Sequence, residues 1–114
     1  MNFIAAVGAP DGRVSVAGAH LSPATRTRVT GPITLGVRPE YLILGASGEE
    51  SLPAVTEFSE YLGGTRFLYA RLADGQSIVA EHRDGPDVRA GETIHMRCPP
   101  ERMRLFSNAG DRLR

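Results

Sequence analysis

Near the middle of the chain stand the residues Leu35-Gly36-Val37-Arg38-Pro39-Glu40-Tyr41-Leu42. Ile33, Leu35 and Val37 alternate with polar or small residues, which predicts a strand with one buried face. Pro39 has no N–H to donate and holds the preceding residue in an extended conformation, so the strand is expected to end there. Residues 40–44 fit either one helical turn or a short second strand.

The charged residues on either side of this proline leave a rigid corner of the backbone. Arg38 and Glu40 therefore have three interpretations. They form a structural ion pair, they form a docking point for a partner, or the corner only stabilises the domain itself. The residues alone leave these alternatives open, and the last is the plainest.

Short runs with alternating apolar residues recur along the rest of the chain. Thirteen Gly and eight Pro interrupt it too often for long helices. Asp74-Gly75 is the strongest hairpin signal, and the imperfect alternation over 54–62 predicts a bulge or an exposed edge. The pattern predicts an all-β, antiparallel barrel or sandwich. Besides the central strand, the expected strands are 1–7, 13–17, 19–21, 54–62, 66–72, 76–82, 92–98 and 102–106.

Length and composition indicate one ordinary domain. The chain has 114 residues, and Lys+Arg 13 balance Asp+Glu 13. This balance argues against a dominant nucleic-acid or anionic-membrane surface. Cys98 is the only cysteine, so no intrachain disulfide forms, and its place beside Ile94 and Met96 predicts a small core residue. No apolar run approaches the length of a membrane span, and we expect a soluble, intracellular chain.

The sequence offers no catalytic or metal site. It contains no lysine and therefore no phosphate-binding loop, so we expect no ATP binding by this chain. His20, His82 and His95 lack metal-ligand spacing. The last two are on strands that are possible neighbours, but we expect both side chains to be solvated. Ser107 has no base nearby in the sequence.

Nucleic-acid binding is also not expected. Oligonucleotide-binding barrels use aromatic platforms and a basic groove. We expect the core to take up most of the aromatic side chains of the second half of the chain, namely Phe58, Tyr61, Phe67 and Tyr69. The one basic concentration is read first as a solvated face and second as a docking face for a partner. It consists of Arg97, Arg102, Arg104, Arg112 and Arg114.

Several motifs occur in an order that resembles a known family. Gly36-Val37-Arg38-Pro39-Glu40 with Leu42 resembles a signature of the C-terminal domain in ATP-binding subunits of bacterial ABC sugar importers, of the maltose and glycerol-phosphate type. That domain carries the TOBE module. The other matching segments are Met1-Asn2-Phe3-Ile4, Glu60-Tyr61-Leu62-Gly63, Asp74-Gly75, and Pro99-Pro100-Glu101-Arg102 through Leu105-Phe106 to Gly110. In two places the chain departs from the family, with Arg104 where His is common and Ser107 where an acidic residue is usual.

The resemblance implies an OB-like barrel with extra N-terminal strands, formed by residues 1–114 as a single regulatory domain. It implies an ATPase domain upstream that holds ATP and Mg²⁺, and no cofactor in this chain. The implied partners are that ATPase domain, a second copy, the permease subunits reached through the ATPase domain, and a regulatory protein. The implied location is the cytoplasmic face of the cell membrane. The alternatives are a small-ligand sensor of the oxyanion type and a stand-alone OB-fold nucleic-acid binder.

No residue is assigned a catalytic, cofactor or metal role. The motifs nominate two kinds of surface for contacts between copies, the corner at Arg38-Pro39-Glu40 and the segment 60–64. The closing motif adds further structural or interface positions. The candidate interface residues are Arg38, Pro39, Glu40, Glu60, Gly63, Pro100, Glu101, Leu105 and Phe106.

Overall fold

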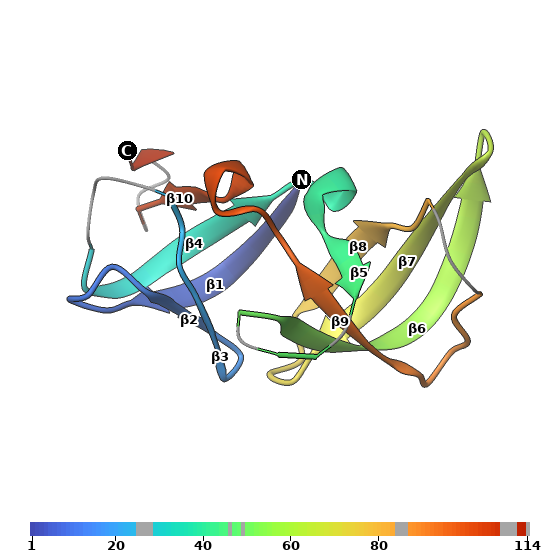
Figure 1. The fold of residues 1–114 in the computed structure, drawn as a ribbon, viewed down its shortest axis with the longest axis horizontal. Coiled ribbons are helices and arrows are strands. Elements are labelled where there is room, and N and C mark those ends of the chain that lie inside the picture. Colours follow the sequence, from blue (N-terminus) through green and yellow to red (C-terminus); the bar gives the residue numbers. More distant parts are fainter. Residues whose placement is uncertain (25–28, 46, 49, 84–86, 108–111, 114) are drawn as a thin grey trace.

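The chain folds into two antiparallel sheets that lie next to each other along the long axis of the molecule (Figure 1). The computed structural model describes residues 1–24, 29–45, 47–48, 50–83, 87–107 and 112–113. The predicted all-β, OB-like architecture with extra N-terminal strands is confirmed. The first sheet has the order β11 (Arg112–Leu113), β10 (Arg104–Phe106), β4 (Gly31–Val37), β1 (Asn2–Gly8), β2 (Val14–Val16) and β3 (Ala19–Leu21). The second has the order β5 (Ile43–Gly45), β9 (Thr93–Arg97), β6 (Leu52–Leu62), β7 (Thr65–Leu72) and β8 (Ser77–Glu81).

The central strand of the first sheet is the one that the alternation predicts. Ile33, Leu35 and Val37 on β4 are each at most 2% exposed, so the predicted buried face is confirmed. β4 pairs with β1 on one side and with β10 on the other. A strand from the middle of the chain therefore holds together strands that lie near its beginning and its end.

Gly36 on β4 is buried because neighbouring side chains occupy the space beside it. A Cβ at this position would lie 2.8 Å from Cε2 of Phe106 and 3.1 Å from Sδ of Met1. The ring of Phe106 also meets that of Phe3 edge to face, with centroids 5.8 Å apart. The glycine of the signature is thus required by the close approach of its neighbours rather than by an unusual backbone conformation.

The second sheet contains the predicted hairpin and the predicted bulge. Asp74-Gly75 joins β7 to β8; Gly75 has φ +91°, and Oδ1 of Asp74 accepts a hydrogen bond from the Gln76 backbone N–H at 3.1 Å. In the β6–β7 pair, Thr56 lies opposite Ala70 but Phe58 lies opposite Tyr69, so Glu57 is the extra residue of a bulge. Both predictions are confirmed.

Beyond the bulge, β6 leaves the core. β9 pairs with β6 only from Leu52 to Val55, and β8 pairs with β7 only as far as Phe67, so the last residues of the β6–β7 ribbon extend alone at one end of the molecule (Figure 1). Phe58 and Tyr61 are therefore 50% and 66% exposed. The prediction that these two side chains belong to the core is wrong, since β9 does not pair with this part of β6. Phe67 and Tyr69 are half-buried, and Phe58 stacks on Tyr69.

A proline-led 3-10 turn marks each of the two passages between the sheets. η1 (Pro39–Tyr41) leads from β4 to β5, and η2 (Pro100–Arg102) leads from β9 to β10. Each turn closes with a 3.3 Å backbone hydrogen bond, from Leu42 N–H to the Pro39 carbonyl and from Met103 N–H to the Pro100 carbonyl. Proline fits the first position because the N–H it lacks would have no partner within the turn. The helical turn and the short strand that the sequence allowed for residues 40–44 both occur, as η1 followed by β5 (Ile43–Gly45).

Two side-chain amides tie the sheets together. β2 pairs with β1 only at Val7 and Gly8, which leaves the start of β1 without a strand on that side. Asn2 Nδ2 donates to the Val79 carbonyl and Asn2 Oδ1 accepts from the Val79 N–H, both at 2.8 Å. The side chain of Gln76 makes the same pair of bonds to the backbone of Ala5, at 2.7 and 3.1 Å. These amides replace a backbone ladder between β1 and β8.

Cys98 lies directly before the second passage. It is half-buried against the core, which supports the predicted packing role, and its thiol donates to the Pro99 carbonyl at 3.5 Å. Burial, and to a smaller extent the Glu101 carboxylate, raise the pKa of the Cys98 thiol to about 11, while Arg104 partly opposes this rise. The thiolate is the nucleophilic form, so the raised pKa makes Cys98 a poor nucleophile near neutral pH.

Asn2→Ala tests the tie between the sheets. The substitution leaves the Val79 N–H and carbonyl without these partners, and we expect the free energy of unfolding to fall by about 1–3 kcal/mol in urea denaturation. Gln76→Ala is the control, because its bonds are exposed and water replaces them, and we expect less than about 1 kcal/mol. If Asn2→Ala lowered the free energy of unfolding no more than Gln76→Ala does, the proposed role of Asn2 in joining the two sheets would be contradicted.

Alkylation of Cys98 tests its environment. At pH 8 a thiol of pKa about 11 is ionised in about one molecule in a thousand. We therefore expect iodoacetamide to react far more slowly with the folded chain than with the chain in urea, as followed by mass spectrometry. Reaction of the folded chain at the rate of a free cysteine would show that the thiol is neither buried nor shifted.

Candidate interaction site

The structure separates the predicted interface residues into two places (Figure 1). The first, here called the crossing corner, consists of η1, η2 and the adjoining ends of β1, β4 and β10. It brings together the predicted residues Arg38, Pro39, Glu40, Pro100, Glu101, Leu105 and Phe106. The second, here called the hairpin tip, consists of residues 58–66 where β6 turns into β7. It contains Glu60 and Gly63.

A side-chain contact joins the two turns of the crossing corner, and hydrogen bonds of Arg104 connect η2 with the start of β10. The guanidinium carbon of Arg102 lies 4.6 Å from the centroid of the Tyr41 ring, within the range of a cation–π contact. Arg104 Nη1 donates to the carbonyls of Glu101 and Met103, at 2.6 and 3.2 Å. Leu105 lies opposite Leu35 and is buried, so this residue of the closing motif serves the core.

The ion pair considered for Arg38 and Glu40 does not form. Both side chains are exposed, and the ion pairs found among the described residues are Arg66–Asp87, Arg71–Glu57 and Arg83–Glu81. η1 carries Glu40 past the corner, so proximity in sequence does not bring the two charges together. The interpretation of Arg38 as a docking residue and the interpretation of the corner as purely structural remain.

A cleft of about 510 Å³ opens at the crossing corner. Among the described residues, four arginines and no carboxylate contribute to its wall. Three of these arginines belong to the basic concentration predicted near the C-terminus; Arg97 of that set lies against a different hollow, beside Ile43, and Arg114 is outside the described residues. The cleft is lined by Met1, Arg38, Tyr41, Arg102, Arg104, Phe106 and Arg112.

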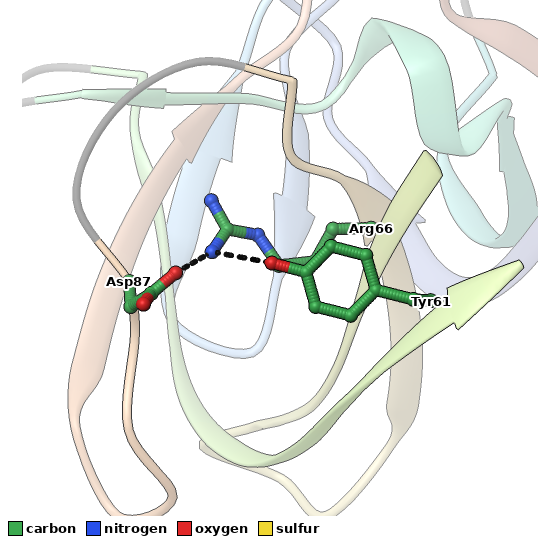
Figure 2. Close-up of polar contacts among 3 residues, drawn as sticks. All are labelled: Tyr61, Arg66 and Asp87. Carbon is green, nitrogen blue, oxygen red and sulfur yellow. Dashed lines mark hydrogen bonds and ion pairs between the residues drawn. The ribbon is translucent and has the colours of Figure 1, made fainter. Parts of the chain in front are cut away.

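A tight turn and a buried arginine shape the hairpin tip. Gly63 and Gly64 have φ +59° and +87°, conformations that other residues rarely adopt, so the glycine of the Glu60–Gly63 motif makes the turn. Figure 2 shows Arg66 between Tyr61 and Asp87. Its side chain is only 10% exposed; it forms an ion pair with Asp87, and its Nη1 donates to the Tyr61 hydroxyl at 3.4 Å.

The hairpin tip and the strand before it present an apolar surface. Leu62 is 53% exposed and shares one face of the ribbon with Phe58 and Val55, whereas Tyr61, opposite Arg66 in the register, is 66% exposed on the other face. The guanidinium carbon of Arg66 also lies 5.8 Å from the centroid of the Tyr61 ring, so Arg66 packs against one face of this exposed ring. Reasoning from the sequence nominated the segment 60–64 as an interface but missed its apolar character, because it assigned Phe58 and Tyr61 to the core. The imperfect alternation over 54–62 was the available signal.

The histidines are not arranged as a metal site. His82 is buried, so the prediction of a solvated side chain there is wrong, and His95 is half-buried. β6 and β7 separate β9 from β8, so the two side chains are not on neighbouring strands as considered. Among the residues that the structure describes, no group of three or more His, Cys, Asp or Glu side chains is placed to hold a metal ion.

The described part of the chain contains no helix with the length and apolar character needed to cross a bilayer.

The chain is similar over its whole length to a lactose transport ATP-binding protein of Rhizobium radiobacter. The two are 33% identical over 125 aligned residues, which cover 34% of that protein. An sn-glycerol-3-phosphate import ATP-binding protein of Agrobacterium fabrum is 31% identical over 78% of the chain and 24% of its own length. A protein of the same description from Salmonella typhi is 32% identical over 65% of the chain and 20% of its own length. The chain thus spans about a third or less of the curated relatives it matches.

The TOBE domain family matches residues 35–106. The match begins in β4 and ends in β10, so it includes both 3-10 turns and the whole second sheet. The matched segment therefore contains the two proline-led turns of the crossing corner and the hairpin tip, while β1, β2 and β3 precede it. This chain belongs to the TOBE domain family.

Proposed function

We propose that this chain is the C-terminal regulatory domain of the ATP-binding subunit of a bacterial ABC importer for a sugar or related solute. Its relatives are described as ATP-binding proteins of lactose transport and sn-glycerol-3-phosphate import, and it matches only a part of each. ATP and Mg²⁺ belong to a separate ATPase domain in this proposal. That domain also connects the chain to the permease subunits at the cytoplasmic face of the membrane.

The mechanical part of the proposal is that two copies contact each other and help hold the ATPase dimer together. The observation that carries it is the apolar surface of the hairpin tip. A surface of this kind on a small domain marks a site of interaction more often than chance. Tyr61 and Leu62 are its most exposed members, and both belong to the segment that the sequence nominated.

The hairpin tip suits a contact between identical copies. In a two-fold dimer the same surface is used by both partners, so it must be self-complementary, and apolar and aromatic side chains meet this requirement. Arg66, which is itself paired with Asp87, contacts the Tyr61 hydroxyl and ring and restrains them, which reduces the entropy lost on association (Figure 2). Four arginines line the cleft at the crossing corner, and two copies of this cleft brought face to face would repel each other. A regulatory protein would use a surface that the dimer leaves free.

Tyr61→Ser with Leu62→Ser tests the contact between copies. We expect sedimentation equilibrium to show dimers of the unmodified chain and a dissociation constant raised about tenfold or more in the double variant, since buried aromatic anchors dominate such interfaces. Val7→Ser is the control, because Val7 is 52% exposed, about as much as Leu62, but lies on β1 away from the hairpin tip. A monomeric unmodified chain, or equal weakening by the control, would contradict the role of the tip.

The size of the native gene product tests the place of the domain in a larger subunit. We expect an immunoblot of the source organism, probed with an antibody against this domain, to show a band several times larger than 12.2 kDa. Mass spectrometry of that band should then detect a phosphate-binding loop. A band near 12.2 kDa would contradict the proposed subunit, whatever the outcome of the sedimentation experiment.

A further inference from the structure

We propose that the crossing corner binds a small organic molecule that carries a dianionic phosphate group. The site is the cleft between the two turns, lined by Arg38, Arg102, Arg104 and Arg112 together with Tyr41, Phe106 and Met1. The inference concerns a ligand of this chain and does not depend on its place in an importer, so it can fail or hold independently of the proposed function.

The charge distribution supports an anion at this place. The chain has no net charge, yet four guanidinium groups line one cleft, and the lining residues that the structure describes include no carboxylate. None of the four forms an ion pair with a described residue, whereas Arg66, Arg71 and Arg83 each pair with an acidic side chain. Like charges gathered around one cleft repel each other, and a bound anion offsets that repulsion.

Two of the arginines are already positioned by the fold. Arg104 is half-buried, and its Nη1 bonds to the carbonyls of Glu101 and Met103 fix the plane of the guanidinium group. Arg102 stacks on the face of Tyr41, an arrangement that leaves the N–H groups in the guanidinium plane available for a ligand. Both side chains have therefore lost part of their conformational freedom before a ligand binds.

The shape of the cleft favours phosphate on an organic body. The planar guanidinium fork matches two oxygens of a phosphate, which gives short, charge-assisted hydrogen bonds. A volume of about 510 Å³ lies in the range of small-molecule sites and exceeds what an inorganic ion fills. Tyr41, Phe106 and Met1 supply apolar surface for the remainder of the molecule.

Calorimetric titration of the chain with phenyl phosphate tests the proposal. We expect saturable binding with a dissociation constant below about 1 mM at low ionic strength, weakening as salt is added. Benzoate, with the ring but a single charge, and inorganic phosphate, without the ring, should each bind more weakly. In amide NMR spectra, the largest shifts on addition of phenyl phosphate should fall on residues of η1, η2 and β10.

Paired substitutions separate a built site from general charge. Arg38→Gln with Arg102→Gln should weaken phenyl phosphate binding about tenfold or more, because each charge-assisted bond is worth about one order of magnitude in affinity. Arg13→Gln with Arg89→Gln removes the same charge from exposed positions outside the cleft and should change the affinity less than about threefold. Arg38→Lys with Arg102→Lys keeps the charge but loses the fork, and should fall between them.

Three results would overturn the proposal. The first is the absence of saturable binding of phenyl phosphate by a chain whose NMR spectrum shows it to be folded. The second is equal weakening by the two glutamine pairs. The third is co-sedimentation with phosphatidic acid vesicles without binding of soluble phenyl phosphate, which would assign the cleft to a lipid headgroup.

Discussion

The stacking of Arg102 on Tyr41 joins the only two places where the described chain passes from one sheet to the other. Each passage needs a proline to end an extended segment and begin a single turn, and the two turns must lie close enough for a side chain of one to cover a ring of the other. A contact of this kind contributes about 0.5–1 kcal/mol at an exposed site, so its importance lies in position more than in strength. The motifs at Pro39 and Pro100 lie about 60 residues apart in the sequence, yet they are neighbours in space because each forms a turn that leads from one sheet to the other.

Local features of the fold were predictable because their causes are local. Alternation fixed the buried face of β4, Asp74-Gly75 fixed a hairpin, and the irregular pattern before Tyr61 fixed a bulge. The pairing of β4 with both β1 and β10 was not predictable in the same way. It depends on contacts between segments far apart in the chain, and only the packing of Phe106 and Met1 against Gly36 shows why that glycine has no side chain.

The candidate site shows the same division. The motifs identified both the crossing corner and the hairpin tip, but they did not indicate that these lie in different places. Sequence reasoning assigned Tyr61 to the core because apolar side chains are usually buried, and it had no means of knowing that the ribbon extends beyond its neighbours. It placed three arginines of the cleft in one basic group, yet Arg38 joins them only through the fold.

The two hydrogen bonds of Asn2 have a mechanical consequence. Asn2 lies on β1 of the first sheet, and its side chain is hydrogen-bonded to Val79 of the second sheet. The chain is therefore attached to both sheets at the residue after Met1. In the proposed subunit, the preceding polypeptide is attached at this doubly held point. A displacement of that polypeptide then turns both sheets together instead of bending one against the other. Because the hairpin tip lies at one end of a molecule 38 Å long, such a rotation displaces the tip farther than the parts of the molecule near Met1 (Figure 1).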